Sequence, residues 1–120
     1  MTTSNAAQGI RRRMGPAVYR EICAEFTGEC ARINATEKKF ECLEKRPGFE
    51  FTVKNLRAGH VLRLNYVATV PAISYECESE SGVVTFQANM LPPPSLVMLH
   101  DGTTLRPIEL AATLLQLIMD

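Results

Sequence analysis

The chain has 120 residues, of which 46% are hydrophobic and 22% are charged, and its formal net charge at pH 7 is zero. This length favours a single domain, and the composition is typical of a globular protein. A zero net charge argues against a protein dedicated to duplex DNA or to an anionic membrane, because such proteins carry a basic excess.

The first segment, residues 1–14, is small and polar and ends in Arg11, Arg12 and Arg13. Such a composition is typical of a disordered tail. We therefore expect a tail over residues 1–14 and one α+β domain over residues 15–120.

The domain is predicted to begin with a helix near Pro16, because proline suits the first helical position. Apolar residues then recur every three or four positions, which indicates one buried helix face. That face consists of Tyr19, Ile22, Cys23, Phe26, Cys30 and Ile33.

From residue 38 onward the apolar period changes to two, which indicates strands. Five strands are expected, near residues 38–45, 49–54, 61–67, 73–79 and 83–89. A connection at 68–71 pairs Leu64 with Tyr75, and a loop at 55–60 pairs Val53 with Leu62. A connection at 79–82 pairs Tyr75 with Phe86. Each pairing keeps apolar residues on one face, as an antiparallel meander with a single buried face requires.

The C-terminal part follows three prolines with a short sixth strand, 96–99, and then the sequence His100-Asp101-Gly102. The Asp-Gly pair predicts a tight turn, after which residues 103–105 pair back briefly. A second helix is expected from Pro107, although Arg106 is a poor N-cap. Both helices are expected on one face of the sheet, so the predicted fold is an α+β two-layer sandwich.

The doublet His100-Asp101 also resembles a metal or catalytic pair. A metal site needs further ligands, and the only other histidine, His60, lies in another loop. We therefore interpret the doublet as a turn, and we expect no catalytic residue, no metal site and no cofactor.

Four cysteines are present: Cys23, Cys30, Cys42 and Cys77. They form no C-x-x-C pair, and no secretory signal is recognisable at the N-terminus. They are therefore predicted to be reduced and buried. No apolar run approaches the roughly 18 residues of a membrane span, so we expect a cytoplasmic protein without membrane contact.

The second helix carries apolar residues around most of its circumference, with only Glu109, Thr113 and Gln116 as a polar stripe before Met119. Apolar surface beyond one stripe is typical of an interface. The sequence therefore predicts a small protein-interaction module, without catalysis, that forms a homodimer. The expected interface residues are Leu96, Met98, Leu110, Leu114, Leu117 and Ile118.

Two alternatives remain open at this stage. A curved sheet around the first helix can enclose a small-molecule or enzymatic cup, whose lining would be Tyr19, Phe26, Leu64, Tyr66, Tyr75 and Phe86. A third function is single-stranded nucleic-acid binding through the basic residues between Lys38 and Arg57. This alternative is disfavoured because the aromatic residues share the face that the helices cover, and bases stack on exposed rings.

Overall fold

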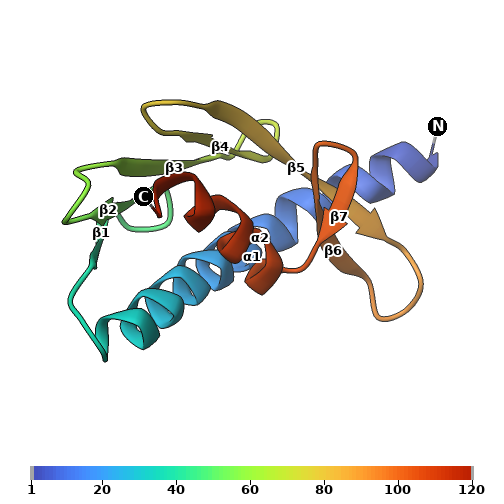
Figure 1. Ribbon diagram of the computed structural model, residues 1–120. Coiled ribbons are helices and arrows are strands. Elements are labelled where there is room, and N and C mark those ends of the chain that lie inside the picture. Colours follow the sequence, from blue (N-terminus) through green and yellow to red (C-terminus); the bar gives the residue numbers. More distant parts are fainter. Residues whose placement is uncertain (1, 120) are drawn as a thin grey trace.

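The computed structural model describes residues 2–119, and it places one long helix before a seven-stranded antiparallel sheet and one short helix after it (Figure 1). The elements in chain order are α1 (Thr2–Asn34), β1 (Phe40–Arg46), β2 (Glu50–Asn55), β3 (Val61–Val67), β4 (Ala72–Glu76), β5 (Ser81–Asn89), β6 (Ser95–His100), β7 (Thr103–Leu105), α2 (Pro107–Leu115) and the single 3₁₀ turn η1 (Gln116–Ile118). Each strand pairs with the next, from β1 to β7. The α+β meander is therefore confirmed, with seven strands instead of five or six.

Helix α1 begins at Thr2, which corrects the prediction of a tail over residues 1–14. The additional turns are anchored, because Ile10 is buried and the side-chain amide of Gln8 donates a hydrogen bond to the carbonyl of Val70 at 3.1 Å. The helix continues through Pro16. Met1, the first residue of the predicted tail, and Asp120, the last of the predicted domain, lie outside the described residues.

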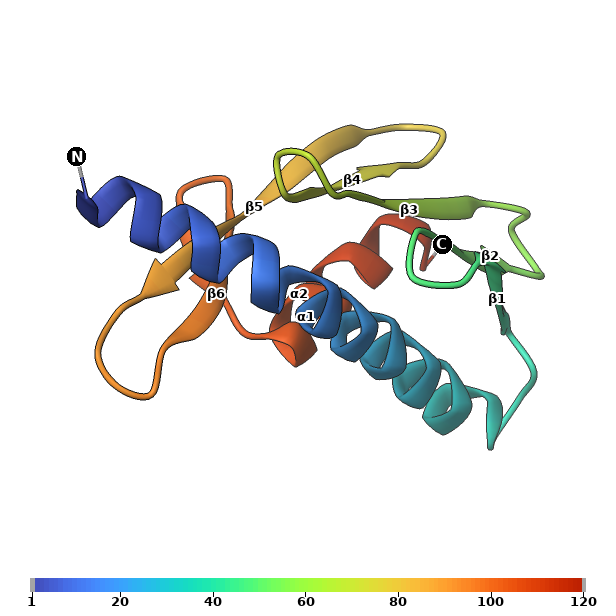
Figure 2. The same cartoon turned by 180° about the vertical axis from the view of Figure 1, so that it is seen from behind.

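The core lies between the two helices and one face of the sheet. In Figures 1 and 2 both helices lie below strands β3 and β4, and the sheet curves over them. Residues alternate between buried and exposed along β2, β3 and β5, so only one face is apolar. The buried cluster joins residues of α1, the sheet, α2 and η1, among them Ile22, Leu62, Ile73, Leu110 and Ile118.

Two of the three predicted strand registers are confirmed. Leu64 pairs with Tyr75, and Val53 pairs with Leu62. The β4–β5 register was predicted wrongly, because Tyr75 pairs with Gly82 and not with Phe86.

Glycine at position 82 explains the β4–β5 register. A Cβ atom there would lie 2.4 Å from the hydroxyl oxygen of Tyr75. The ring of Tyr75 thus occupies the space that any side chain at this position would need.

The seventh strand depends on the tight turn after β6. Asp101 and Gly102 have φ of 49° and 79°, the positive values that a two-residue hairpin turn of type I′ requires. His100 then pairs with Thr103, and Met98 with Leu105. The predicted turn is therefore confirmed.

The C-terminal segment is fixed at both ends. At the start of α2 the carboxylate of Glu109 accepts a hydrogen bond from the backbone N–H of Arg106 at 2.9 Å, which supplies half of a capping box where the sequence indicated a poor cap. At the end of η1, the buried Asn55 donates to the carbonyls of Ile118 and Met119 at 2.6 and 3.1 Å. Among residues 2–119, no helix has the length and apolarity to cross a membrane.

Candidate functional site

The His100-Asp101 doublet forms part of a turn, and its side chains diverge. The imidazole of His100 is turned inward, where its Nε2 lies 2.6 Å from the hydroxyl of Tyr75, whereas the side chain of Asp101 is 87% exposed. Asp101 approaches the same nitrogen only to 3.6 Å. Within the described part of the chain, no three potential metal ligands gather in one place. The contact with Tyr75 is long-range in sequence, and no local pattern indicated it.

The six residues predicted to line a cup are all buried in the core. Their rings fill the space, because the ring centroids of Tyr19 and Tyr66 lie 5.3 Å apart and those of Tyr66 and Phe86 lie 6.3 Å apart. Phe26 and Leu64 have no exposed surface at all. Tyr19 is the one member of the set that lines the hollow beside α1 described next.

An open groove instead runs between α1 and the edge strand β1, and we call it the α1–β1 groove. It consists of two hollows of about 280 and 300 Å³ that share Thr27. The first is lined by Tyr19, Arg20, Cys23, Ala24, Thr27, Glu44, Gly48, Glu50 and Phe51. The second is lined by Thr27, Cys30, Ala31, Asn34, Lys38, Phe40, Glu41 and Cys42.

Three of the four cysteines face this groove, and all four are free thiols. Only Cys30 is fully buried, whereas Cys23, Cys42 and Cys77 are half-buried, so the prediction of four buried thiols is wrong for three of them. For Cys23 and Cys42 the reason is the position of β1 at the sheet edge, where no further strand covers the groove, whereas Cys77 lies just after the end of β4.

The groove gives its thiols different acidities. Burial raises the pKa of Cys23 to about 12. The neighbouring thiol of Cys30 lowers the pKa of Cys42, and the thiol of Cys42, together with burial, raises the pKa of Cys30. Burial also raises the pKa of Tyr19, whose hydroxyl donates to backbone carbonyls and stays protonated.

The residues predicted to form a dimer interface divide into two groups. Met98, Leu110, Leu114 and Ile118 are completely buried within the single chain, so they offer no surface to a second copy. Leu96 and Leu117 are half-buried. Helix α2 is apolar around most of its circumference because α1 covers one flank, the sheet covers another, and η1 folds back against β3.

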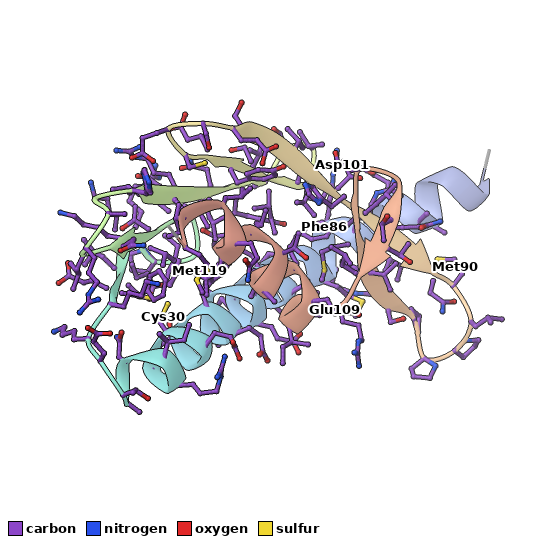
Figure 3. All side chains as sticks on the ribbon, viewed as in Figure 1. Cys30, Phe86, Met90, Asp101, Glu109 and Met119 are labelled. Atoms are coloured by element: carbon purple, nitrogen blue, oxygen red, sulfur yellow. The ribbon has the colours of Figure 1, made fainter. Side chains whose placement is uncertain are left out.

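A different apolar surface lies at the far end of the β5–β6 hairpin, residues 87–97, which we call the hairpin tip. Its loop projects away from the rest of the molecule in both Figure 1 and Figure 2. Leu91 is 75% exposed and Met90 is 40% exposed, and Figure 3 shows Met90 beside that loop. An open hollow of about 350 Å³ beside them is lined by Gln87, Ala88, Asn89, Met90 and Val97.

The hairpin tip also lies in the longest uncharged run of the chain. Residues 81–99 contain no Asp, Glu, Lys or Arg. The apolar strand 96–99 drew attention to this region, whereas the exposure of the loop follows only from the structure.

The basic residues between Lys38 and Arg57 do not form a continuous surface of one sign. Arg46 forms an ion pair with Glu50 at 3.3 Å, and Arg57 forms one with Glu37. The cationic groups of Lys39 and Arg46 lie over the rings of Phe40 and Phe49. The acidic partners Glu37 and Glu50 weaken the attraction of these basic residues for a phosphate backbone.

No family model, no curated protein and no solved structure matches this chain. The α1–β1 groove and the hairpin tip are therefore the two features from which a function can be inferred.

Proposed function

We propose that the chain is a small protein-interaction module that forms a two-fold homodimer through the hairpin tip. The observation that supports this best is the combination of an exposed leucine and an uncharged surface. Leu91 is 75% exposed, within a run from 81 to 99 that carries no charged residue. Exposed apolar surface of this kind is typical of interaction sites. The proposal requires no catalysis.

A second copy of the same chain is the partner that this surface fits best. In a two-fold interface each residue approaches the equivalent surface of the other copy. Charged residues near the axis would therefore face charges of the same sign, and the uncharged hairpin tip avoids that repulsion.

The hairpin tip is also complementary to itself in shape. Leu91 projects from it, and the hollow of about 350 Å³ lined in part by Met90 and Val97 lies beside it on the same hairpin. Two copies can each insert Leu91 into the hollow of the other. Burial of one leucine side chain contributes roughly 1.5–3 kcal/mol, and the symmetry doubles this contribution.

This proposal moves the interface from α2 to the hairpin and retains Leu96 from the predicted set. It also changes which variants are informative. Leu114 is completely buried, so Leu114→Glu reports on folding and not on association. Leu91→Glu places its charge in solvent in the monomer and in the uncharged hollow of the partner copy in the dimer.

Sedimentation equilibrium at micromolar concentration tests the proposal. We expect a dimer for the wild type and a monomer for Leu91→Glu that still unfolds cooperatively, at a temperature lowered only by the lost association. Leu43→Glu is the matched control, because Leu43 is 52% exposed on the edge strand far from the hairpin tip, and this variant should stay dimeric. A monomeric wild type, or a Leu91→Glu variant that stays dimeric, would refute the interface.

The α1–β1 groove supports a second candidate function, a site for a small molecule. Its larger polar groups are the Tyr19 hydroxyl, the Arg20 guanidinium and the carboxylates of Glu44 and Glu50, around a hollow of about 280 Å³. Melting curves with and without pooled metabolites test this function, since a ligand that binds only the folded state raises the melting temperature. Arg20→Ala, which changes the rim of the hollow, should abolish any such shift.

We also propose that the protein works in the cytoplasm. Its four cysteines are free, and a reducing compartment keeps thiols in that state.

A further inference from the structure

Two thiols meet across the α1–β1 groove, one from each of the elements that border it. Cys30 belongs to α1 and Cys42 to β1, and the two thiols are close enough that each shifts the pKa of the other. Figure 3 labels Cys30 on the part of α1 near the β1–β2 hairpin. Both residues line the same hollow of about 300 Å³.

The two thiols differ in access. Cys42 is half-buried, whereas Cys30 is only 3% exposed. A small molecule that enters the hollow therefore reaches Cys42 first. Cys30 can react only with a group that is already attached to Cys42.

The two thiols also differ in acidity, and the more accessible thiol, Cys42, is the more acidic one. The neighbouring thiol of Cys30 lowers the pKa of Cys42, with a smaller contribution from the hydroxyl of Thr27. The neighbouring thiol of Cys42 and burial raise the pKa of Cys30. Because the thiolate is the nucleophile in disulfide exchange, Cys42 is the thiol that attacks.

We propose that Cys42 and Cys30 form a dithiol site that is oxidised to a disulfide by low-molecular-weight disulfides of the glutathione type. The thiolate of Cys42 attacks one sulfur of the small disulfide, its S–S bond breaks, and one small thiolate leaves. Cys30 then loses its proton and attacks the Cys42 sulfur of the mixed disulfide, and the second small thiolate leaves. The dithiol is oxidised by two electrons, the small disulfide is reduced to two thiols, and the protons from both cysteines end on those thiols.

The product would tie α1 covalently to the edge strand β1. The α1–β1 groove, which is open in the reduced protein, would then be bridged at the hollow that holds Cys30 and Cys42. This inference is independent of the proposed homodimer, because the hairpin tip lies at the other end of the sheet from β1.

The full-length reduced protein, treated with oxidised glutathione and digested without reductant, tests the site by mass spectrometry. We expect a Cys30–Cys42 disulfide in the wild type and no stable glutathione adduct. A wild type that accumulates glutathione on Cys42, or that forms a disulfide involving Cys23 or Cys77, would overturn the proposal. This arm needs no variant and therefore does not depend on how substitutions fold.

Variants then separate the two roles. Cys30→Ser should stop at a glutathione adduct on Cys42, and Cys30→Ala provides the same readout if serine disturbs the buried site. Cys42→Ser should leave Cys30 unmodified, because the exposed nucleophile is absent. Cys77→Ser is the matched control and should form the Cys30–Cys42 disulfide as the wild type does. Modification of Cys30 in the Cys42→Ser variant would contradict the order of attack.

Discussion

The hydroxyl of Tyr75 on β4 and Nε2 of His100 at the end of β6 form a hydrogen bond of 2.6 Å. Burial raises the pKa of Tyr75, with smaller contributions from Asp101 and Glu80, so the hydroxyl keeps its proton. The rings also meet edge to face, with centroids 5.5 Å apart. His100 is thus held by a residue of β4 although β5 lies between their strands.

The first prediction concerns this pair. His100→Ala should lower the free energy of unfolding by about 1–3 kcal/mol, because it leaves the buried hydroxyl of Tyr75 without a partner. Urea denaturation measures the effect. The combined variant with Tyr75→Phe should lose less than the sum of the two single changes, since they remove the same bond.

The other histidine provides the control for this prediction. His60 is 40% exposed and contacts the exposed Glu78 at 3.6 Å, so His60→Ala should change stability little. Equal losses for the two histidines would show that the bond to Tyr75 contributes nothing.

The second prediction concerns two glycines with opposite surroundings. Gly82→Ala should destabilise the fold, because its Cβ would collide with the ring of Tyr75, which His100 holds in place. Gly28→Ala should stabilise it by about 1 kcal/mol, because Gly28 lies in α1 and a Cβ atom added there would meet nothing within 4 Å. Thermal melting should show a lower melting temperature for Gly82→Ala and a higher one for Gly28→Ala. A Gly82→Ala protein as stable as the wild type would refute the steric argument.

The same contact shows where prediction from sequence reaches its limit. The apolar alternation of β4 and β5 fits equally well when the pairing moves by four residues, because an even shift leaves every side chain on its own face. The sequence therefore predicted the meander correctly and the β4–β5 register wrongly. The choice between the two registers depends on the space beside Gly82, which the packed ring of Tyr75 fills.

The helices illustrate a second limit of the sequence. The apolar circumference of α2 was interpreted as an interface, whereas α1 and the sheet cover it within one chain. The exposed Leu91 and the facing thiols of Cys30 and Cys42 were not predicted. Local periodicity identifies which face is apolar, but it does not identify which distant element covers that face.

The third prediction concerns Asn55, which connects the β2–β3 loop to the C-terminal turn. Its amide donates to the carbonyls of Ile118 and Met119, and its oxygen accepts from the backbone N–H groups of Arg57 and Ala58, each at 3.0 Å. Asn55→Asp keeps the acceptor and replaces the donor by an anion that repels both carbonyls. We expect a loss of about 2–4 kcal/mol, as for a buried polar network that loses one partner.

Hydrogen exchange of η1 provides a local readout of this loss. In the Asn55→Asp variant, the amide protons of η1 should exchange faster than in the wild type, even where those of β3 still exchange at the wild-type rate. Asn65→Asp is the control, because Asn65 is only half-buried on the other face of the sheet, and it should leave exchange in η1 unchanged. Equal exchange in the two variants would contradict the role of Asn55.

The last prediction concerns the pH dependence of α2. Hydrogen bonds from the backbone and side chain of Arg106 lower the pKa of Glu109 below its ordinary value of 4.5. A group whose pKa is lower in the folded state stabilises that state above its unfolded pKa, and the contribution disappears as the pH falls through the folded value. Glu109→Gln should therefore be less stable than the wild type at neutral pH, and the difference should shrink in acid below pH 4.5. Denaturant titrations of both proteins across this range measure it. A difference that stays constant with pH would show that the amide and the carboxylate cap the helix equally well, and that the negative charge at the start of α2 contributes nothing.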